Sequence, residues 1–363
     1  MENLRIPGPT PLPNEVLQAM TKQMINHRGA EFRKILLGVT ENLKQLFQTK
    51  NDVFLLTGSG TGGLEALIVN TLSPGDKVLS VSIGVFGDRF ASIAKQFGAE
   101  VISYKTEMGK AADVDAIKKA LQAEPAIKAV LVTHNETSTG VTNDLKTIAA
   151  TVKEFDKLLL VDAISSLGSI ELPVDKWNCD VVASGSQKGW MAPPGLAMVS
   201  INEAGWKAFK KAKMPRFYWD FGKAKASLEK GENPWTPSIT VVYAMSVSLE
   251  MMMKEGLPNI IERHKRIGNM TREGIKSLGL PLLADPEYAS NTVTAVLGHE
   301  GLDLKKVSQL LKEKYQIVVS GGQGALTGKI FRIGHLGWVH ENEIQDIISA
   351  LKVILPEAGF RRA

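Results

Sequence analysis

Short apolar runs alternate with amphipathic stretches through most of this chain. From about residue 51, seven mostly apolar runs are separated by segments with helical periodicity. Because strands that are apolar on both faces are typical of a parallel sheet covered by helices, the pattern predicts an α/β fold built on a mostly parallel seven-stranded sheet. The runs are Val53 to Leu56, Lys77 to Val81, Glu100 to Tyr104, Ala129 to Thr133, Leu158 to Val161, Val181 to Ser184 and Ala197 to Ile201.

Helical periodicity precedes and follows these strands. Two helices are expected between about residues 15 and 50, and a methionine-rich helix from Tyr243 to Lys254 is expected to continue past Gly256 into the basic stretch Ile260 to Leu278. The pattern predicts a large domain over residues 16–255 and a smaller C-terminal α+β domain over residues 256–363, joined by the N-terminal segment 1–15. The smaller domain should contain strands at Asn291 to Leu297, Gln316 to Ser320 and Lys329 to Ile333.

Composition excludes several classes of protein. The net charge of +5 comes from 43 basic and 38 acidic residues, and the only dense basic block, Lys207 to Lys213, is expected to be the solvated face of a helix. We therefore expect no nucleic-acid partner. The first residues lack the apolar core of a secretory signal, and no stretch reaches the roughly 18 apolar residues that a membrane helix needs, so a cytoplasmic protein with no membrane partner is expected.

The chain has a single cysteine, Cys179, which excludes an intrachain disulfide and any site built from several thiolates. We expect Cys179 to be buried within a strand. The six histidines form no close cluster with carboxylates along the sequence, so no metal is expected.

Lys188 lies where an apolar strand gives way to small and hydroxylic residues, in Ser184-Gly185-Ser186-Gln187-Lys188. Such a lysine is either surface charge or a nucleophile. The strand that ends in Asp162 supplies a carboxylate for a protonated ring nitrogen, and the loop Thr57 to Gly63 can hold a phosphate at a helix N-terminus. A Schiff-base lysine, an acid and an anion site are what pyridoxal phosphate (PLP) requires, and this favours the cofactor interpretation.

The glycine loop also satisfies the pattern of a dinucleotide-binding site. That site needs an acid at the end of the next strand to hold the ribose, but the strand from Lys77 ends at Ser82. The sequence therefore lacks the acid that would hold the ribose of a nicotinamide cofactor, which argues against a dehydrogenase. The glycine loop could still be a tight turn that binds no ligand.

Two further residues have alternative interpretations. Phe86 could stack on a planar cofactor or fill the core. Arg332 lies in an apolar strand, where it could bind a substrate carboxylate through two hydrogen bonds or form an internal salt bridge.

Taken in order, these segments resemble the class V aminotransferases of PLP fold type I, in particular the alanine–glyoxylate and serine–glyoxylate (or serine–pyruvate) enzymes. The likeness covers nearly the whole chain. It rests on Pro7-Gly8-Pro9-Thr10, the Thr-Gly-Ser-Gly loop, His134-Asn135-Glu136-Thr137-Ser138-Thr139-Gly140, Val161-Asp162-Ala163, Gly185-Ser186-Gln187-Lys188, Trp235-Thr236-Pro237 and Arg332-Ile333-Gly334.

The resemblance implies a role for each matching residue. Lys188 would form the Schiff base, Asp162 would pair with the pyridine nitrogen, and Phe86, where many relatives have tryptophan, would stack on the ring. Arg332 would bind the α-carboxylate of the substrate beside Gly8. The remaining contacts would be Ser59, Gly60, Thr61 and Gln187 to the phosphate, Thr137 to the ring hydroxyl, and Thr236 to the phosphate of the second subunit in a homodimer with shared active sites.

The implied activity is PLP-dependent transamination between alanine or serine and a 2-oxo acid, glyoxylate or pyruvate. An aspartate-type transaminase, a lyase such as a cysteine desulfurase, and an accessory protein labelled as a soluble hydrogenase subunit remain alternatives. A desulfurase attacks with a cysteine on a mobile loop, and the expected place of Cys179 in a strand argues against it.

Overall fold

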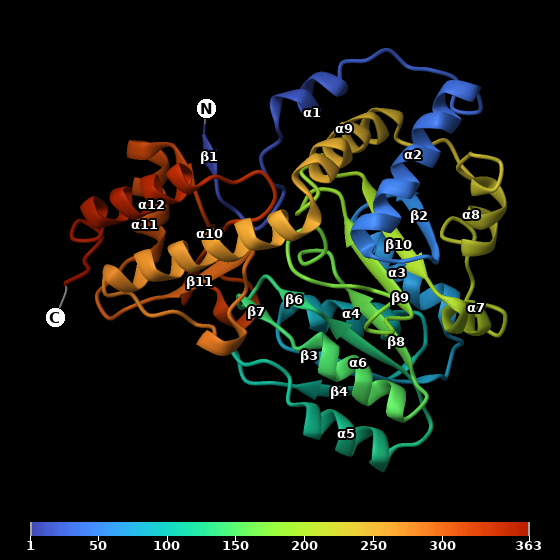
Figure 1. Cartoon of the computed structure of the whole chain (residues 1–363). Helices are drawn as coiled ribbons and strands as arrows, with labels where there is room; N and C mark the ends of the chain where they lie inside the picture. Colours follow the sequence, from blue (N-terminus) through green and yellow to red (C-terminus); the bar gives the residue numbers. More distant parts are fainter. Residues whose placement is uncertain (1, 362–363) are drawn as a thin grey trace.

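The computed structural model describes residues 2–361. Its centre is a mixed sheet of seven strands, which confirms the fold class predicted from the sequence (Figure 1). Strand β10 runs antiparallel to both of its neighbours, and the strands from β9 to β4 pair in parallel. In spatial order the strands are β2 (Asp52–Thr57), β10 (Leu196–Ile201), β9 (Val181–Gly185), β8 (Leu158–Asp162), β5 (Ile127–Thr133), β3 (Lys77–Ser82) and β4 (Glu100–Lys105).

Helices cover both faces of this sheet. In β5, Val130 and Val132 pack into one hydrophobic core, and Ala129 and Leu131 pack into another on the opposite face. Since neighbouring strand residues point to opposite faces, a strand covered on both sides must be apolar throughout, as the sequence pattern indicated. One face is covered by α2 (Ala30–Phe47), α5 (Val114–Ala123), α6 (Leu145–Glu154) and α9 (Ile239–Glu255), and the other by α3 (Gly60–Thr71), α4 (Val85–Gln96), α7 (Glu203–Phe209) and α8 (Phe221–Leu228).

The long C-terminal helix expected from the sequence is two helices. α9 ends at Glu255, and α10 (Leu257–Ser277) begins after Gly256 and leaves in another direction (Figure 1). Gly256 has a φ of +83°, a conformation that favours glycine, and Pro258 lies in the first turn of α10, where its missing N–H has no cost. The expectation of a continuous helix was therefore wrong.

The C-terminal part of the chain has its own core and a small antiparallel sheet in the order β11 (Val293–Leu297), β14 (Ile330–Gly334), β13 (Ser320–Gly321). The strand expected over Gln316 to Ser320 is split, because β12 (Ile317–Val318) pairs with β1 (Asn3–Leu4) while β13 pairs with β14. The shorter elements are α1 (Asn14–Ala19), β6 (Asn135–Glu136), β7 (Val141–Thr142), η1 (Pro286–Tyr288), α11 (Leu304–Tyr315), η2 (Gly324–Leu326) and α12 (Glu341–Ile354).

The division into residues 16–255 and 256–363, joined by residues 1–15, remains a proposal: the C-terminal part has a core of its own, but Ile260 packs into the core of the large part. Residues 1 and 362–363 lie outside the described residues. The pairing of β1 with β12 brings the N-terminal segment onto the smaller domain. None of the helices within residues 2–361 has the length and apolar character needed to cross a membrane.

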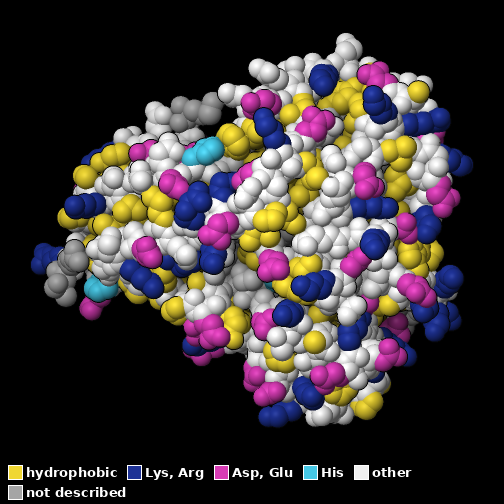
Figure 2. Space-filling view, viewed as in Figure 1, with side chains coloured by type: hydrophobic (Ala, Val, Ile, Leu, Met, Phe, Trp, Pro, Cys, Tyr) yellow, Lys and Arg dark blue, Asp and Glu magenta, His cyan; other side chains and the backbone are white. Residues whose placement is uncertain are grey.

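The basic block Lys207 to Lys213 begins in α7. Lys207, Lys210 and Lys211 are exposed, and Lys207 pairs with Glu203 at 2.9 Å. Figure 2 shows acidic and basic side chains mixed over the visible face of the molecule. These lysines thus lie on the solvated surface, as the sequence indicated.

Candidate active site

Several of the predicted site residues meet at one edge of the central sheet. β8 ends in Asp162, and the segments that follow β2, β5 and β9 carry Ser59, Thr137 and Lys188. Parallel strands end at a common edge, so residues distant in sequence come together there. One cavity is lined by eight of the predicted residues, namely Ser59, Gly60, Thr61, Phe86, Thr137, Asp162, Gln187 and Lys188.

Lys188 lies three residues after the end of β9, and its ammonium group donates a hydrogen bond to the carbonyl of Pro7. The pKa of Lys188 is lowered to about 8, chiefly by burial; Arg332 and Arg89 act in the same direction and Asp162 opposes them. A lysine that loses its proton near neutral pH can act as a nucleophile and a base.

Asp162 is a buried carboxylate whose side chain forms no ion pair with any Lys, Arg or His of residues 2–361. Its Oδ1 accepts a hydrogen bond from the Ile164 amide at 3.0 Å, and its Oδ2 accepts one from the Thr133 hydroxyl at 3.5 Å. Burial raises the pKa of Asp162 to about 7, and the nearby charge of Glu136 acts in the same direction. A cationic partner within the cavity would relieve this cost of burial.

The N-terminus of α3 faces the same cavity. Ser59 is its N-cap residue, no side chain caps the helix there, and the first turn has no acidic residue. The amides and dipole of a helix N-terminus favour an anion. A Cβ on Gly60 would lie 2.6 Å from Cδ1 of Ile164, so only glycine allows this close approach. The loop is therefore suited to a phosphate.

Phe86 lies in the first turn of α4 and is half-buried at the cavity wall, so it lines the site and does not fill the core. Glu136, for which the sequence alone indicated no role, anchors this turn. Its carboxylate is fully buried and accepts hydrogen bonds from the amides of Phe86 at 3.0 Å and Gly87 at 3.1 Å. A buried carboxylate at a helix N-terminus thus fixes the aromatic side chain.

Arg332 lies within β14, and its guanidinium bonds only to backbone carbonyls in the described part of the chain. Nε donates to Gly321 at 2.9 Å and Nη1 donates to Thr137 at 2.9 Å. No acidic side chain of residues 2–361 lies within 4.0 Å of it, although the residue is only 4% exposed. Among the described residues, Arg332 therefore does not form the internal salt bridge that was one of its two interpretations. Its guanidinium can bind an anionic ligand.

Gly8 lies directly against the side chain of Lys188. A Cβ at Gly8, whose φ is +127°, would lie 2.7 Å from the lysine Nζ. The conformation favours glycine, and any side chain there would displace the lysine side chain, so this glycine lets the N-terminal segment lie against Lys188.

The family model of the class-V aminotransferases matches residues 3–336 of the chain. The protein belongs to the class-V aminotransferase family. It is an enzyme of PLP fold type I, and this confirms the family, the fold and the cofactor expected from the sequence.

Individual relatives carry different names. The chain is 46% identical to the "Soluble hydrogenase 42 kDa subunit" of Anabaena cylindrica, over 98% of this chain and 94% of that protein. It is 35% identical to the L-aspartate–glyoxylate aminotransferase of Paracoccus denitrificans, over 98% of this chain and 91% of the relative. The crystal structure of an alanine–glyoxylate aminotransferase from Nostoc sp. is similar with a TM-score of 0.94, 30% identity and coverage of 98% of this chain and 95% of that one.

The residues of this aminotransferase fit pyridoxal phosphate. Asp162 offers a buried carboxylate to the ring nitrogen, and the N-terminus of α3 offers amides to the phosphate. The side-chain oxygen of Gln187 is buried with no hydrogen-bond partner among residues 2–361, which suits a residue that awaits a polar ligand. Lys188 lies beside both groups in the same cavity.

Thr236 lies outside this cavity. The residue is exposed on the surface of its own chain and does not line the site that contains Lys188. Its proposed contact with the phosphate of a second subunit stays a prediction.

The aminotransferase cavity also contains residues that the sequence analysis did not assign. Arg89 lines the cavity. Phe86 lies one helical turn before Arg89, and the guanidinium carbon of Arg89 is 4.7 Å from the centre of the Phe86 ring. Asn135 lines the cavity as well and donates to the hydroxyl of Ser165 at 2.8 Å. Asn135 lies in the segment His134 to Gly140 that carries the family resemblance, and the spacing of Phe86 and Arg89 on one helix face could have indicated the arginine.

Cys179 is buried, as expected, but it lies two residues before β9 and not within a strand. Burial raises the pKa of its thiol to about 12, which disfavours the thiolate needed for attack. Within residues 2–361 no three His, Cys, Asp or Glu side chains are grouped so that they could hold a metal ion.

Proposed function

We propose that this aminotransferase moves the amino group of alanine or serine to a small 2-oxo acid, glyoxylate or pyruvate. The observation that carries the proposal is Arg332, a buried guanidinium without a carboxylate partner in the described chain, whose Nη1 donates to the carbonyl of Thr137 in the wall of the cavity that contains Lys188. Amino acids and 2-oxo acids share a carboxylate, which a guanidinium can hold through two hydrogen bonds. The names of the Paracoccus and Nostoc relatives both include glyoxylate, which supports this acceptor.

Each residue would have a separate task. When bound, pyridoxal phosphate supplies an electron-withdrawing ring that makes the Cα proton of an attached amino acid acidic. Asp162 would keep the ring nitrogen protonated, and Phe86 would hold the ring from one side. Nζ of Lys188 would take the proton from the substrate Cα and deliver it to a carbon of the cofactor. The lysine can do both because its pKa lies near neutrality. Arg332 would orient the substrate so that this proton faces the lysine.

An assay of purified protein with each donor and acceptor tests the proposal. Alanine, serine and aspartate would each be offered with glyoxylate and with pyruvate, and the 2-oxo acid formed from the donor would be measured. Turnover of alanine or serine with glyoxylate is expected. Turnover of none of the three donors, in protein that shows the yellow absorbance of bound cofactor, would refute the proposed transamination and favour a lyase or an accessory role.

Aspartate is a second candidate donor, and a specific observation favours it. Arg89 lines the cavity and forms no ion pair or hydrogen bond within residues 2–361. Such a cation could bind a side-chain carboxylate, and one relative is named as an aspartate–glyoxylate enzyme. A preference for aspartate that is lost in Arg89→Gln would establish this alternative.

Arg332→Lys is expected to lower kcat/KM for every donor by a similar factor, corresponding to about 2–3 kcal/mol, because a point charge replaces a two-pronged contact. The absorbance of bound cofactor should change little. Arg266→Lys, an exposed arginine of α10, is the matched control. A defect confined to one donor would mean that Arg332 recognises a side chain, and loss of cofactor would mean that it supports the fold.

We also propose a homodimer in which Thr236 reaches the partner's phosphate. Next to Thr236, the rings of Trp235 and Phe217 stack 4.8 Å apart, and Phe217 is 67% exposed. Exposed stacked aromatics are typical of protein interfaces. Analytical ultracentrifugation should show a dimer, and Phe217→Asp should weaken it and release cofactor. An active monomer that retains cofactor at nanomolar concentration would contradict the shared site.

A further inference from the structure

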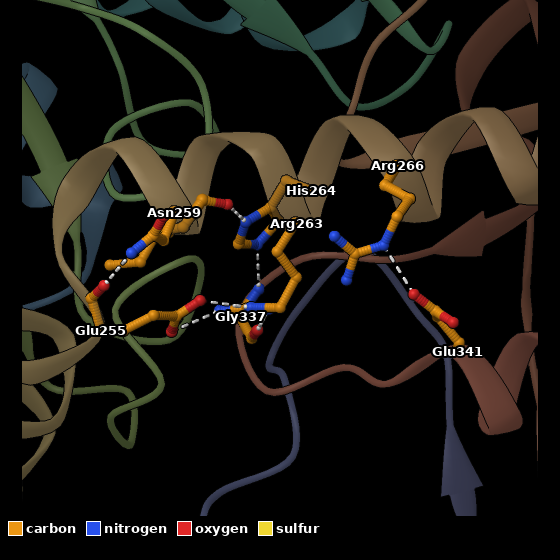
Figure 3. A network of polar contacts seen from close by, with 8 residues as sticks. Glu255, Asn259, Arg263, His264, Arg266, Gly337 and Glu341 are labelled. Carbon is orange, nitrogen blue, oxygen red and sulfur yellow. Dashed lines mark hydrogen bonds and ion pairs between the residues drawn. The ribbon is translucent and has the colours of Figure 1, made fainter.

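Both backbone polar groups of Gly337, which lies beyond β14, are bound by consecutive residues of α10. Nη1 of Arg263 donates to the carbonyl of Gly337 at 3.0 Å, and the amide of Gly337 donates to Nε2 of His264 at 3.0 Å (Figure 3). We call Arg263, His264 and Gly337 the glycine clamp. The N–H and the C=O of Gly337 are thereby satisfied by a single helix.

The role of His264 in the clamp depends on its tautomer. Its Nδ1 lies 2.7 Å from the carbonyl of Ile260, which can only accept, so the proton is on Nδ1 and Nε2 is free to accept from Gly337. Burial, with the adjacent charge of Arg263, lowers the pKa of His264 to about 3. The imidazole is therefore neutral near physiological pH, and the acceptor is always present.

Arg263 is itself held in place. Its Nε and Nη2 bond to the two carboxylate oxygens of Glu255 at 2.7 and 3.1 Å, and Glu255 is the last residue of α9 (Figure 3). An arginine that donates two hydrogen bonds to one carboxylate is fixed in orientation as well as stabilised. The clamp is thus fixed to the end of a helix that packs on the large sheet.

Gly337 touches the backbone of the proposed catalytic lysine. A Cβ at Gly337, whose φ is +72°, would lie 2.9 Å from the carbonyl oxygen of Lys188 and 3.1 Å from Oγ1 of Thr10. That hydroxyl donates to the same Lys188 carbonyl at 3.2 Å. Gly337 therefore lies so close to the backbone of Lys188 that a side chain at this position would meet the Lys188 carbonyl.

The same loop leads back to the proposed carboxylate-binding residue. Gly337 follows Arg332 along one continuous segment, in which Gly334 ends β14 and its amide donates to the carbonyl of Arg5. A shift of the clamped peptide would therefore move the end of β14 relative to Lys188.

We propose that Arg263 and His264 are positioning residues of the aminotransferase: they hold the Gly337 peptide against Lys188 and so set the spacing between Lys188 and Arg332. This inference rests on the proposed role of Arg332 in binding the substrate carboxylate. Because a misplacement of about 1 Å can cost on the order of 100-fold in rate, loosening the clamp should affect turnover although neither residue lines the cavity.

The test compares His264→Phe and Arg263→Met with Arg266→Met. Arg266 lies on the same helix, but its ion pair with Glu341 is exposed and does not involve Gly337 (Figure 3). In the clamp variants kcat should fall by about 10- to 100-fold and the KM for each donor should rise. In cofactor-free protein, hydrogen exchange of residues 334–338 should become faster. Arg266→Met should show neither change, and His264→Gln should recover part of the activity because its amide oxygen can accept from Gly337.

Each outcome decides the proposal. Unchanged kcat and exchange in both clamp variants would overturn it, as would a lower melting temperature with unchanged kcat and KM at 25 °C. If His264→Phe does not fold, Arg263→Met and His264→Gln carry the same comparison. Hydrogen exchange needs neither cofactor nor substrate, so a wild type that transaminates no donor would refute the proposed function while the exchange result would still decide the clamp.

Discussion

Replacement of Lys188 with alanine is expected to reduce transamination by at least about 1,000-fold, because it removes both the covalent attachment point and the base that moves the Cα proton. Lys188 lines the cavity with Asp162 and the α3 N-terminus, and burial brings its pKa to about 8. The rate of donor turnover measures the effect, together with borohydride reduction, which links cofactor to protein only through a lysine Schiff base.

The fold should survive this substitution, because the ammonium group makes a hydrogen bond only to the carbonyl of Pro7 among the described residues. Circular dichroism and dimer mass should match the wild type. Lys210→Ala, at an exposed lysine beyond α7, controls for loss of charge and should retain full activity. An alanine variant at position 188 with wild-type turnover would refute the role of Lys188.

Asp162→Asn should have the second largest effect. An amide cannot keep the ring nitrogen protonated, so turnover should fall by well over tenfold while the cofactor can still bind through its phosphate. Asp156→Asn, an exposed carboxylate after α6, is the control. Turnover within about tenfold of the wild type, or roughly 1.4 kcal/mol of barrier, would mean that Asp162 is structural.

The stability of the cofactor-free protein provides a second measurement at Asp162. Its pKa is raised from 3.8 to about 7, so its contribution to stability is present at low pH and is lost as pH rises through the folded value. Asparagine does not titrate. The stability of the wild type should fall, relative to that of cofactor-free Asp162→Asn, as pH rises from about 3.8 to about 7, so the variant should melt no lower than the wild type above about pH 7, and this advantage should disappear below about pH 3.8. A variant that is much less stable at both pH values would indicate a packing role.

The sequence by itself determined the central sheet and the identity of its chemistry. The run Ala129 to Val132 of β5 is apolar without alternation because helices cover both faces of the sheet, and this pattern is visible without a structure. Asp162 and Lys188 follow strands, and the ends of parallel strands converge, so their meeting at one edge could be predicted. The strands are visible as local periodicity, and the meeting of Asp162 and Lys188 follows from the rule that parallel strands end at a common edge of the sheet.

Only the tertiary structure decided where the chain bends and which groups remain without partners. The split between β12 and β13 follows from pairing with distant segments, which no local pattern encodes, whereas the turn at Gly256 uses a glycine and a proline that are visible in the sequence but whose conformation only the structure shows. Whether Arg332 forms a salt bridge depended on which side chains surround it in space.

The glycine clamp and Glu136 lay outside the reach of the sequence for the same reason. His264 and Gly337 are 73 residues apart, and Glu136 holds a helix 49 residues earlier in the chain. Each hydrogen bond needs donor and acceptor within about 3 Å and in line, a condition set by the packing of whole elements. A sequence specifies which groups are available, and the folded packing determines which of them meet.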